Sequence, residues 1–67
     1  MSMEYVRSYY GVPAKRGRQV RLGLGFGKRL AGKGGVITGS RGQYLRVRLD
    51  DGERVLLHPT WEVTYLP

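Results

Sequence analysis

Eleven glycines and three prolines interrupt this chain of 67 residues every few positions. Because glycine and proline weaken or break helices, they confine regular structure to short segments. No window of about eleven or more residues has the apolar spacing i, i+3, i+4, i+7 between helix caps. The sequence therefore predicts a β protein that is assembled from short strands.

Five segments have the composition of strands. Apolar and polar residues alternate at 18–24 and 43–50, which gives each of these segments one apolar and one polar face. β-branched residues dominate 34–39, and apolar residues recur at 53–58 and 62–66. Ten side chains are expected to form most of the core: Val20, Leu22, Val36, Leu45, Val47, Leu49, Val55, Leu57, Trp61 and Val63.

The connections between these segments are also readable. Asp51-Gly52 has the composition of a type I′ hairpin turn, in which both central residues take positive φ. Residues 39–42 are expected to reverse the chain between the second and third strands. The segment 58–61 predicts a one-turn 3₁₀ helix before the last strand, because Pro59 lacks an amide hydrogen and Thr60 can cap a helix.

This order of strands and turns is typical of an SH3-like barrel. We therefore expect one all-β domain, with a five-stranded SH3-like barrel at 18–67 and an N-terminal arm at 1–17. The arm is interpreted as an edge strand, a packed arm or a short helix. Trp61 is interpreted as an anchor that plugs one end of the barrel, with a ligand platform as the alternative.

Positive charge is concentrated in the first half of the chain. Residues 1–35 carry eight Lys or Arg and one acidic residue, whereas residues 36–67 carry four of each sign. The formal net charge is +7 and the pI is near 10.4. This balance favours a polyanionic partner, and the alternative is that the charge only keeps the protein in solution.

The glycine-rich stretch 23–35 contains three of these cations, Lys28, Arg29 and Lys33. Residues 27–34 match a P-loop except that Gly34 replaces the hydroxyl residue that would hold magnesium, and a strand follows instead of a helix. A nucleotide site is therefore not expected. The loop is interpreted as a cationic segment that follows a phosphate backbone, with a solvated hairpin loop as the alternative.

A second set of cations lies on the predicted strands. Arg21, Arg46 and Arg48 are out of phase with the apolar positions, so we expect them on the solvent face with Tyr44. Such a face stacks bases and neutralises phosphates in small barrels, although exposed arginines are ordinary on strands. The predicted nucleic-acid-binding residues are Lys28, Arg29, Lys33, Arg21, Arg46, Arg48 and Tyr44.

The sequence offers little for catalysis or cofactors. It has no cysteine and a single histidine, His58, so we expect no metal and no other cofactor. Three of the five acids crowd the hairpin turn at 50–53, and no nucleophile has a visible base, so we expect no enzyme. We expect no membrane segment and no leader, a cytoplasmic location and a monomer.

Four stretches resemble a group of small uncharacterised proteins encoded by bacteriophages and prophages. They are 9–17, 35–39, 42–47 and 58–63, together with Leu66; the specific parts are Tyr9-Tyr10-Gly11-Val12-Pro13-Ala14 and His58-Pro59-Thr60-Trp61-Glu62. The basic glycine-rich loop is longer here than in that group. A looser resemblance, at 17–22 and 32–37, is to KOW motifs, whose strand pairs bind RNA or proteins. The first resemblance implies a fold and a phage origin but no activity.

These observations together predict a small basic phage or prophage protein that binds DNA or RNA weakly, mostly through the backbone. The alternative is an interaction module that docks an acidic host or phage protein, with Tyr5, Tyr9 and Tyr10 as its contact surface.

Overall fold

The computed structural model describes residues 3–67 as five strands and three short helical segments. The elements are α1 (Met3–Tyr10), β1 (Gln19–Leu22), the 3₁₀ helix η1 (Leu24–Phe26), α2 (Gly27–Leu30), β2 (Gly34–Arg41), β3 (Tyr44–Leu49), β4 (Arg54–Leu57) and β5 (Val63–Tyr65). The five predicted strands are confirmed, and each begins and ends within two residues of its expected bounds.

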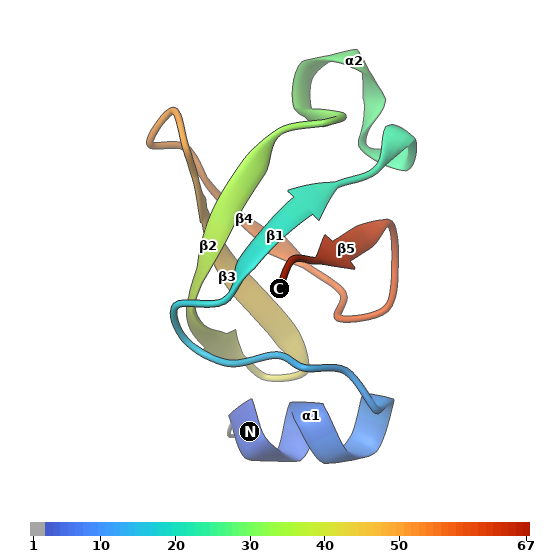
Figure 1. The fold of residues 1–67 in the computed structure, drawn as a ribbon, viewed down its shortest axis with the longest axis vertical. Helices are drawn as coiled ribbons and strands as arrows, with labels where there is room; N and C mark the ends of the chain where they lie inside the picture. The colour runs from blue at the N-terminus through green and yellow to red at the C-terminus, as the bar shows by residue number, and fades with distance from the viewer. Residues whose placement is uncertain (1–2) are drawn as a thin grey trace.

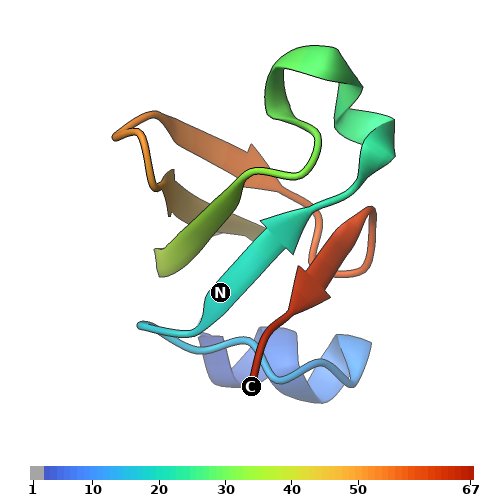
Figure 2. The same ribbon diagram turned by 45° about the horizontal axis from the view of Figure 1, so that its top comes forward.

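The strands form one antiparallel sheet with the order β4-β3-β2-β1-β5 (Figure 1). β1 therefore lies between β2 and the C-terminal strand β5, as Figure 2 shows. No pair joins β4 to β5 among the described residues, so the expectation of a closed barrel is wrong. β4 ends at Leu57, and Pro59, which has no amide hydrogen for a further ladder, follows it almost at once. The molecule is a compact globule of 31 × 23 × 20 Å.

Three predicted turns differ from the structure. The reversal predicted at 39–42 lies at residues 42–43, because β2 continues to Arg41, which pairs with Tyr44. Residues 58–61 form a simple turn, closed by the hydrogen bond from the Trp61 amide to the His58 carbonyl at 3.2 Å, and the 3₁₀ helix lies at η1 instead. The hairpin turn at 49–53 is not type I′, because Gly52 has positive φ (93°) and Asp51 does not. The Gly52 amide donates to the Leu49 carbonyl at 2.8 Å, as expected for a type I turn followed by a glycine bulge.

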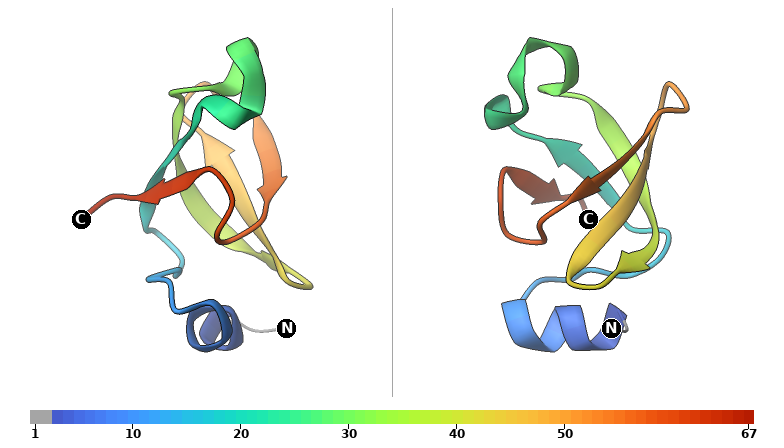
Figure 3. Two further views of the ribbon diagram at one scale, coloured as in Figure 1. Left: turned by 90° about the vertical axis from the view of Figure 1, so that its right-hand side faces the viewer. Right: turned by 180° about the vertical axis from the view of Figure 1, so that it is seen from behind.

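The N-terminal segment is a helix that covers one end of the sheet (Figures 1 and 3). Met3, Val6 and Tyr10 follow the spacing i, i+3, i+7 and turn toward the core, where Val6 is fully buried. Gly11 ends the helix with a φ of 66°, and its amide donates to the Arg7 carbonyl at 2.9 Å. The described part of the segment is therefore a short helix that packs against the sheet, and not an edge strand.

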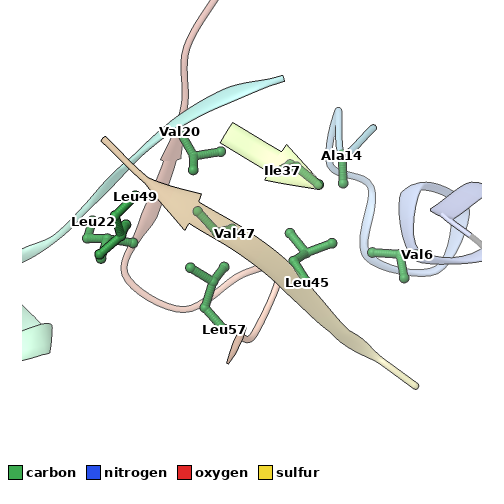
Figure 4. Packing of buried hydrophobic residues seen from close by; sticks show 9 residues of the cluster. All are labelled: Val6, Ala14, Val20, Leu22, Ile37, Leu45, Val47, Leu49 and Leu57. Atoms are coloured by element: carbon green, nitrogen blue, oxygen red, sulfur yellow. The ribbon is translucent and has the colours of Figure 1, made fainter. Parts of the chain in front are cut away.

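Nine buried apolar side chains form the core: Val6, Ala14, Val20, Leu22, Ile37, Leu45, Val47, Leu49 and Leu57 (Figure 4). Six of the ten predicted core residues are among them. Val36, Val55 and Val63 are only partly buried. On β2 the inward residue is Ile37, which lies opposite Val47, so its neighbour Val36 points outward and lies opposite Arg48.

Trp61 is not a core residue. Its side chain is 52% exposed, so the interpretation as a plug for one end of the barrel is wrong. Trp61 makes an edge-to-face contact with Phe26 of η1, with ring centroids 5.0 Å apart. The turn at 58–61 and the positive φ of Glu62 (53°) leave the indole outside the cluster of buried residues.

Candidate nucleic-acid interface

The outer face of β2, β3 and β4 carries a groove that is lined by four arginines. Side chains alternate along β3, so Leu45, Val47 and Leu49 point into the core while Arg46 and Arg48 point outward. Arg54 and Leu56 of β4 lie opposite Arg48 and Arg46. The outward side chains of the three strands line a hollow of about 560 Å³, which we call the arginine groove: Thr38, Arg41, Arg46, Arg48, Arg54 and Leu56.

Arg48 and Arg54 make the groove electrostatically unusual, because they occupy directly opposite positions on neighbouring antiparallel strands. Like charges in such a pair destabilise a sheet unless something neutralises them. Among residues 3–67, neither Arg41, Arg46, Arg48 nor Arg54 forms an ion pair. The groove therefore presents four uncompensated guanidinium groups, each with several N–H donors in a planar fork suited to phosphate or carboxylate.

Two of the three cations of the glycine-rich loop, by contrast, form ion pairs with acids of the β3–β4 hairpin. Arg29 of α2 contacts Glu53 at 2.7 Å, and Lys33 contacts Asp51. The loop and the tip of the hairpin lie at the same end of the molecule (Figure 3). The hydrogen bond from Lys33 lowers the pKa of Asp51, and the hydrogen bond to Glu53 raises the pKa of Arg29. Both pairs therefore favour the charged forms.

Two glycines of the loop have a structural role next to an acid. The Gly23 amide donates to the Glu62 carbonyl at 2.7 Å. A Cβ atom at Gly23 would lie 2.2 Å from the Glu62 carboxylate, and one at Gly25 would lie 2.6 Å from Glu62 Cγ. These glycines make room for a negatively charged side chain, which is the opposite of a phosphate cradle.

The predicted site residues are thus divided between separate surfaces. Arg46, Arg48 and Tyr44 lie on β3, where the two arginines line the groove and Tyr44 lies at its end away from the hairpin tip. Lys28 is exposed on α2 with the paired Arg29. Arg21 is exposed on β1, opposite Gly34 of β2 and Thr64 of β5, and it does not line the groove. The structure does not bring the seven residues together.

Three residues line the groove without being among those predicted from the sequence: Arg41, Arg54 and Leu56. A signal for Arg54 and Leu56 was present, because they alternate with Val55 and Leu57 in the predicted strand. Arg41 was assigned to a turn, but β2 continues to it and pairs it with Tyr44. A β-bulge between Ile37 and Gly39 shifts the register of β2 against β3 before Arg41. No local pattern in the sequence predicts this bulge.

No group of three or more His, Cys, Asp or Glu side chains in residues 3–67 is placed to hold a metal ion. No helix in the same range is long and apolar enough to cross a membrane.

Comparison of the chain with protein-family models, with curated proteins and with solved structures found no match. The resemblance to small phage proteins therefore stays a prediction, and the arginine groove is interpreted from its own geometry.

Proposed function

We propose that this chain is a small SH3-like module of phage or prophage origin that binds nucleic acid through the arginine groove. The order of the antiparallel strands, with the last strand beside the first, supports the SH3-like assignment. The observation that carries the function is the opposed pair Arg48 and Arg54, flanked by Arg46 and Arg41, without an ion-paired acid. A polyanion in the groove relieves the repulsion that the sheet otherwise bears.

The groove fits a phosphate backbone better than it fits a set of base edges. Its arginines stand on the face of a sheet, whereas readers of the DNA major groove insert a protruding helix or β-ribbon. Arg46 and Arg48 are two residues apart on β3, so their backbone positions are separated by about 6.7 Å along the strand. Their side chains can therefore contact successive phosphates of a flexible strand. We therefore expect weak binding with little sequence preference and a strong dependence on salt.

An NMR titration tests this proposal. Amide and arginine side-chain resonances are followed while a short oligonucleotide is added at low salt. We expect the shifts to concentrate on Arg41, Arg46, Arg48 and Arg54, and to disappear when salt is raised. The proposal fails if no resonance moves at low salt, or if the shifts concentrate on 27–33 and spare β3 and β4.

The alternative function is docking of an acidic protein. The exposed, stacked rings of Tyr5 and Tyr9, with centroids 5.5 Å apart, favour it because aromatic side chains are enriched at protein interfaces. An acidic peptide added in the same titration separates the two functions. If the peptide moves the resonances of Tyr5 and Tyr9 at a salt concentration that abolishes oligonucleotide binding, the protein partner is the better explanation.

A further inference from the structure

A row of aromatic rings begins where the arginine groove ends. Tyr44 of β3 lies opposite Arg41 and is followed by His58, with ring centroids 6.3 Å apart. The row continues to Tyr10 of α1 at 4.9 Å and then to Tyr9 at 4.9 Å. The rings come from three separate parts of the chain, so the fold itself assembles the row.

Tyr44 has the exposure that a stacking platform needs. Its side chain is 43% exposed, although it is the first residue of a strand whose apolar residues are buried. The rings of Tyr44 and His58 meet at 77°, and in such an edge-to-face pair His58 covers at most one face of Tyr44. The Thr60 amide donates to His58 Nδ1 at 3.2 Å and holds the imidazole in place.

The groove and the row form one continuous surface. Arg41 and Leu56 line the arginine groove, and the same two residues join Tyr44 in lining a second hollow beside it. The other end of the groove leads to the hairpin tip, which carries Asp50, Asp51 and Glu53. Asp51 and Glu53 are paired there with Lys33 and Arg29, so the hairpin tip offers a polyanion no excess of positive charge. The opposite end of the groove offers the exposed ring of Tyr44, so we expect the path of the ligand to lead there.

We infer that the ligand is a single-stranded nucleic acid, with phosphates along the arginine groove and a base stacked on Tyr44. The inference rests on the proposed function and names its substrate class. A duplex offers phosphates to the arginines, but its base faces are covered by neighbouring bases. A single strand offers both phosphates and free base faces, and base–aromatic stacking adds affinity with little dependence on sequence.

Three fluorescently labelled probes of equal length test the inference by anisotropy at low salt and across a salt series. They are an oligothymidylate, a duplex, and an abasic strand that keeps the sugars and phosphates. We expect the oligothymidylate to bind about tenfold more tightly than the abasic strand, as one stacked base predicts. The duplex is expected to bind no better than the abasic strand once its greater charge density is allowed for with a salt series.

Tyr44→Ala is expected to weaken oligothymidylate binding about tenfold and to leave abasic binding unchanged. Tyr44→Phe, which keeps the ring, is the matched control and should bind like the unmodified protein. Thermal unfolding of each variant checks that it is folded. If Tyr44→Ala does not fold, the comparison of the oligothymidylate with the abasic strand on the unmodified protein still decides the question.

The possible failures are distinguishable. If all three probes bind alike and Tyr44→Ala changes none of them, the single-strand inference is overturned while the proposed function stands. If no probe binds at low salt, both are overturned. Labelled polyglutamate is added as a fourth polyanion; if it binds and none of the three nucleic-acid probes does, both are again overturned and the groove belongs to an acidic protein partner.

Discussion

Two cationic regions of this small protein differ in whether their charge is available. The glycine-rich loop holds Arg29 and Lys33 in ion pairs with Glu53 and Asp51. The arginine groove holds four arginines without an ion pair among the described residues. The acids of the second half of the chain are thus used to neutralise cations of the first half. The four arginines of the second half are therefore left without an acidic partner in residues 3–67, and they add available positive charge to that of the exposed Lys15, Arg16, Arg21 and Lys28.

The two regions also differ in how deeply their apolar side chains are buried, and core substitutions should show the largest effects. Leu45 of β3 lies directly beneath the groove and is fully buried, whereas Leu24 of the loop is 87% exposed. Leu45→Ala is expected to lower the free energy of unfolding by about 2–5 kcal/mol, and Leu24→Ala by less than about 0.5 kcal/mol. Denaturant unfolding of both variants measures the difference. Equal losses would show that the loop is part of the core.

Two glycines give a smaller and more local contrast. A Cβ atom at Gly35 would lie 2.8 Å from the Arg48 carbonyl oxygen, a backbone atom of the strand that carries the groove. Gly35→Ala is therefore expected to cost about 1–3 kcal/mol. At Gly25 the clash is with the exposed Glu62 side chain, which can move, so Gly25→Ala should stay within about 1 kcal/mol of the unmodified protein. Thermal unfolding that ranks the two in the reverse order would contradict this account.

The strands and part of the groove could be predicted from the sequence. Alternation of apolar and polar residues located the strands at 18–24 and 43–50, because burial of one face of a sheet imposes a period of two, and β-branched or apolar composition located the other three. The same alternation identified Arg46, Arg48 and Tyr44 as outward residues. The helix α1 was left open, because eight residues with a single buried valine make a weak helical pattern.

The pairing of charges could not be predicted in the same way. Arg29 and Glu53 are 24 residues apart in sequence, and only the docking of α2 beside the hairpin brings them together. The exposure of Trp61 depends likewise on the turn at 58–61 and on Glu62, the one non-glycine residue with positive φ in the described range. Long-range contacts of this kind leave no periodic signal in the chain.

The ion pairs of the loop predict a modest pH dependence. The pKa of Asp51 is lowered in the folded state, mainly by the hydrogen bond from Lys33, so the pair contributes stability above the ordinary aspartate pKa of about 3.9. This contribution is lost as the pH falls through the lowered pKa. We expect Lys33→Met to reduce the decrease in melting temperature between neutral and strongly acidic pH, with little change from pH 7 to 5. An unchanged acid transition would show that Lys33 does not hold Asp51.

The central claim, that the groove and not the loop carries the available charge, is tested most directly by two double variants with the same net charge. Arg48→Ala with Arg54→Ala and Lys28→Ala with Arg29→Ala each remove two of the seven net positive charges. Anisotropy across a salt series on single-stranded DNA measures the slope of log K against log salt. Four phosphate contacts predict a slope of about −2.8, and the groove variant should flatten it by about 1.4, while the loop variant keeps it. Equal flattening in both variants, or flattening in the loop variant alone, would contradict the account.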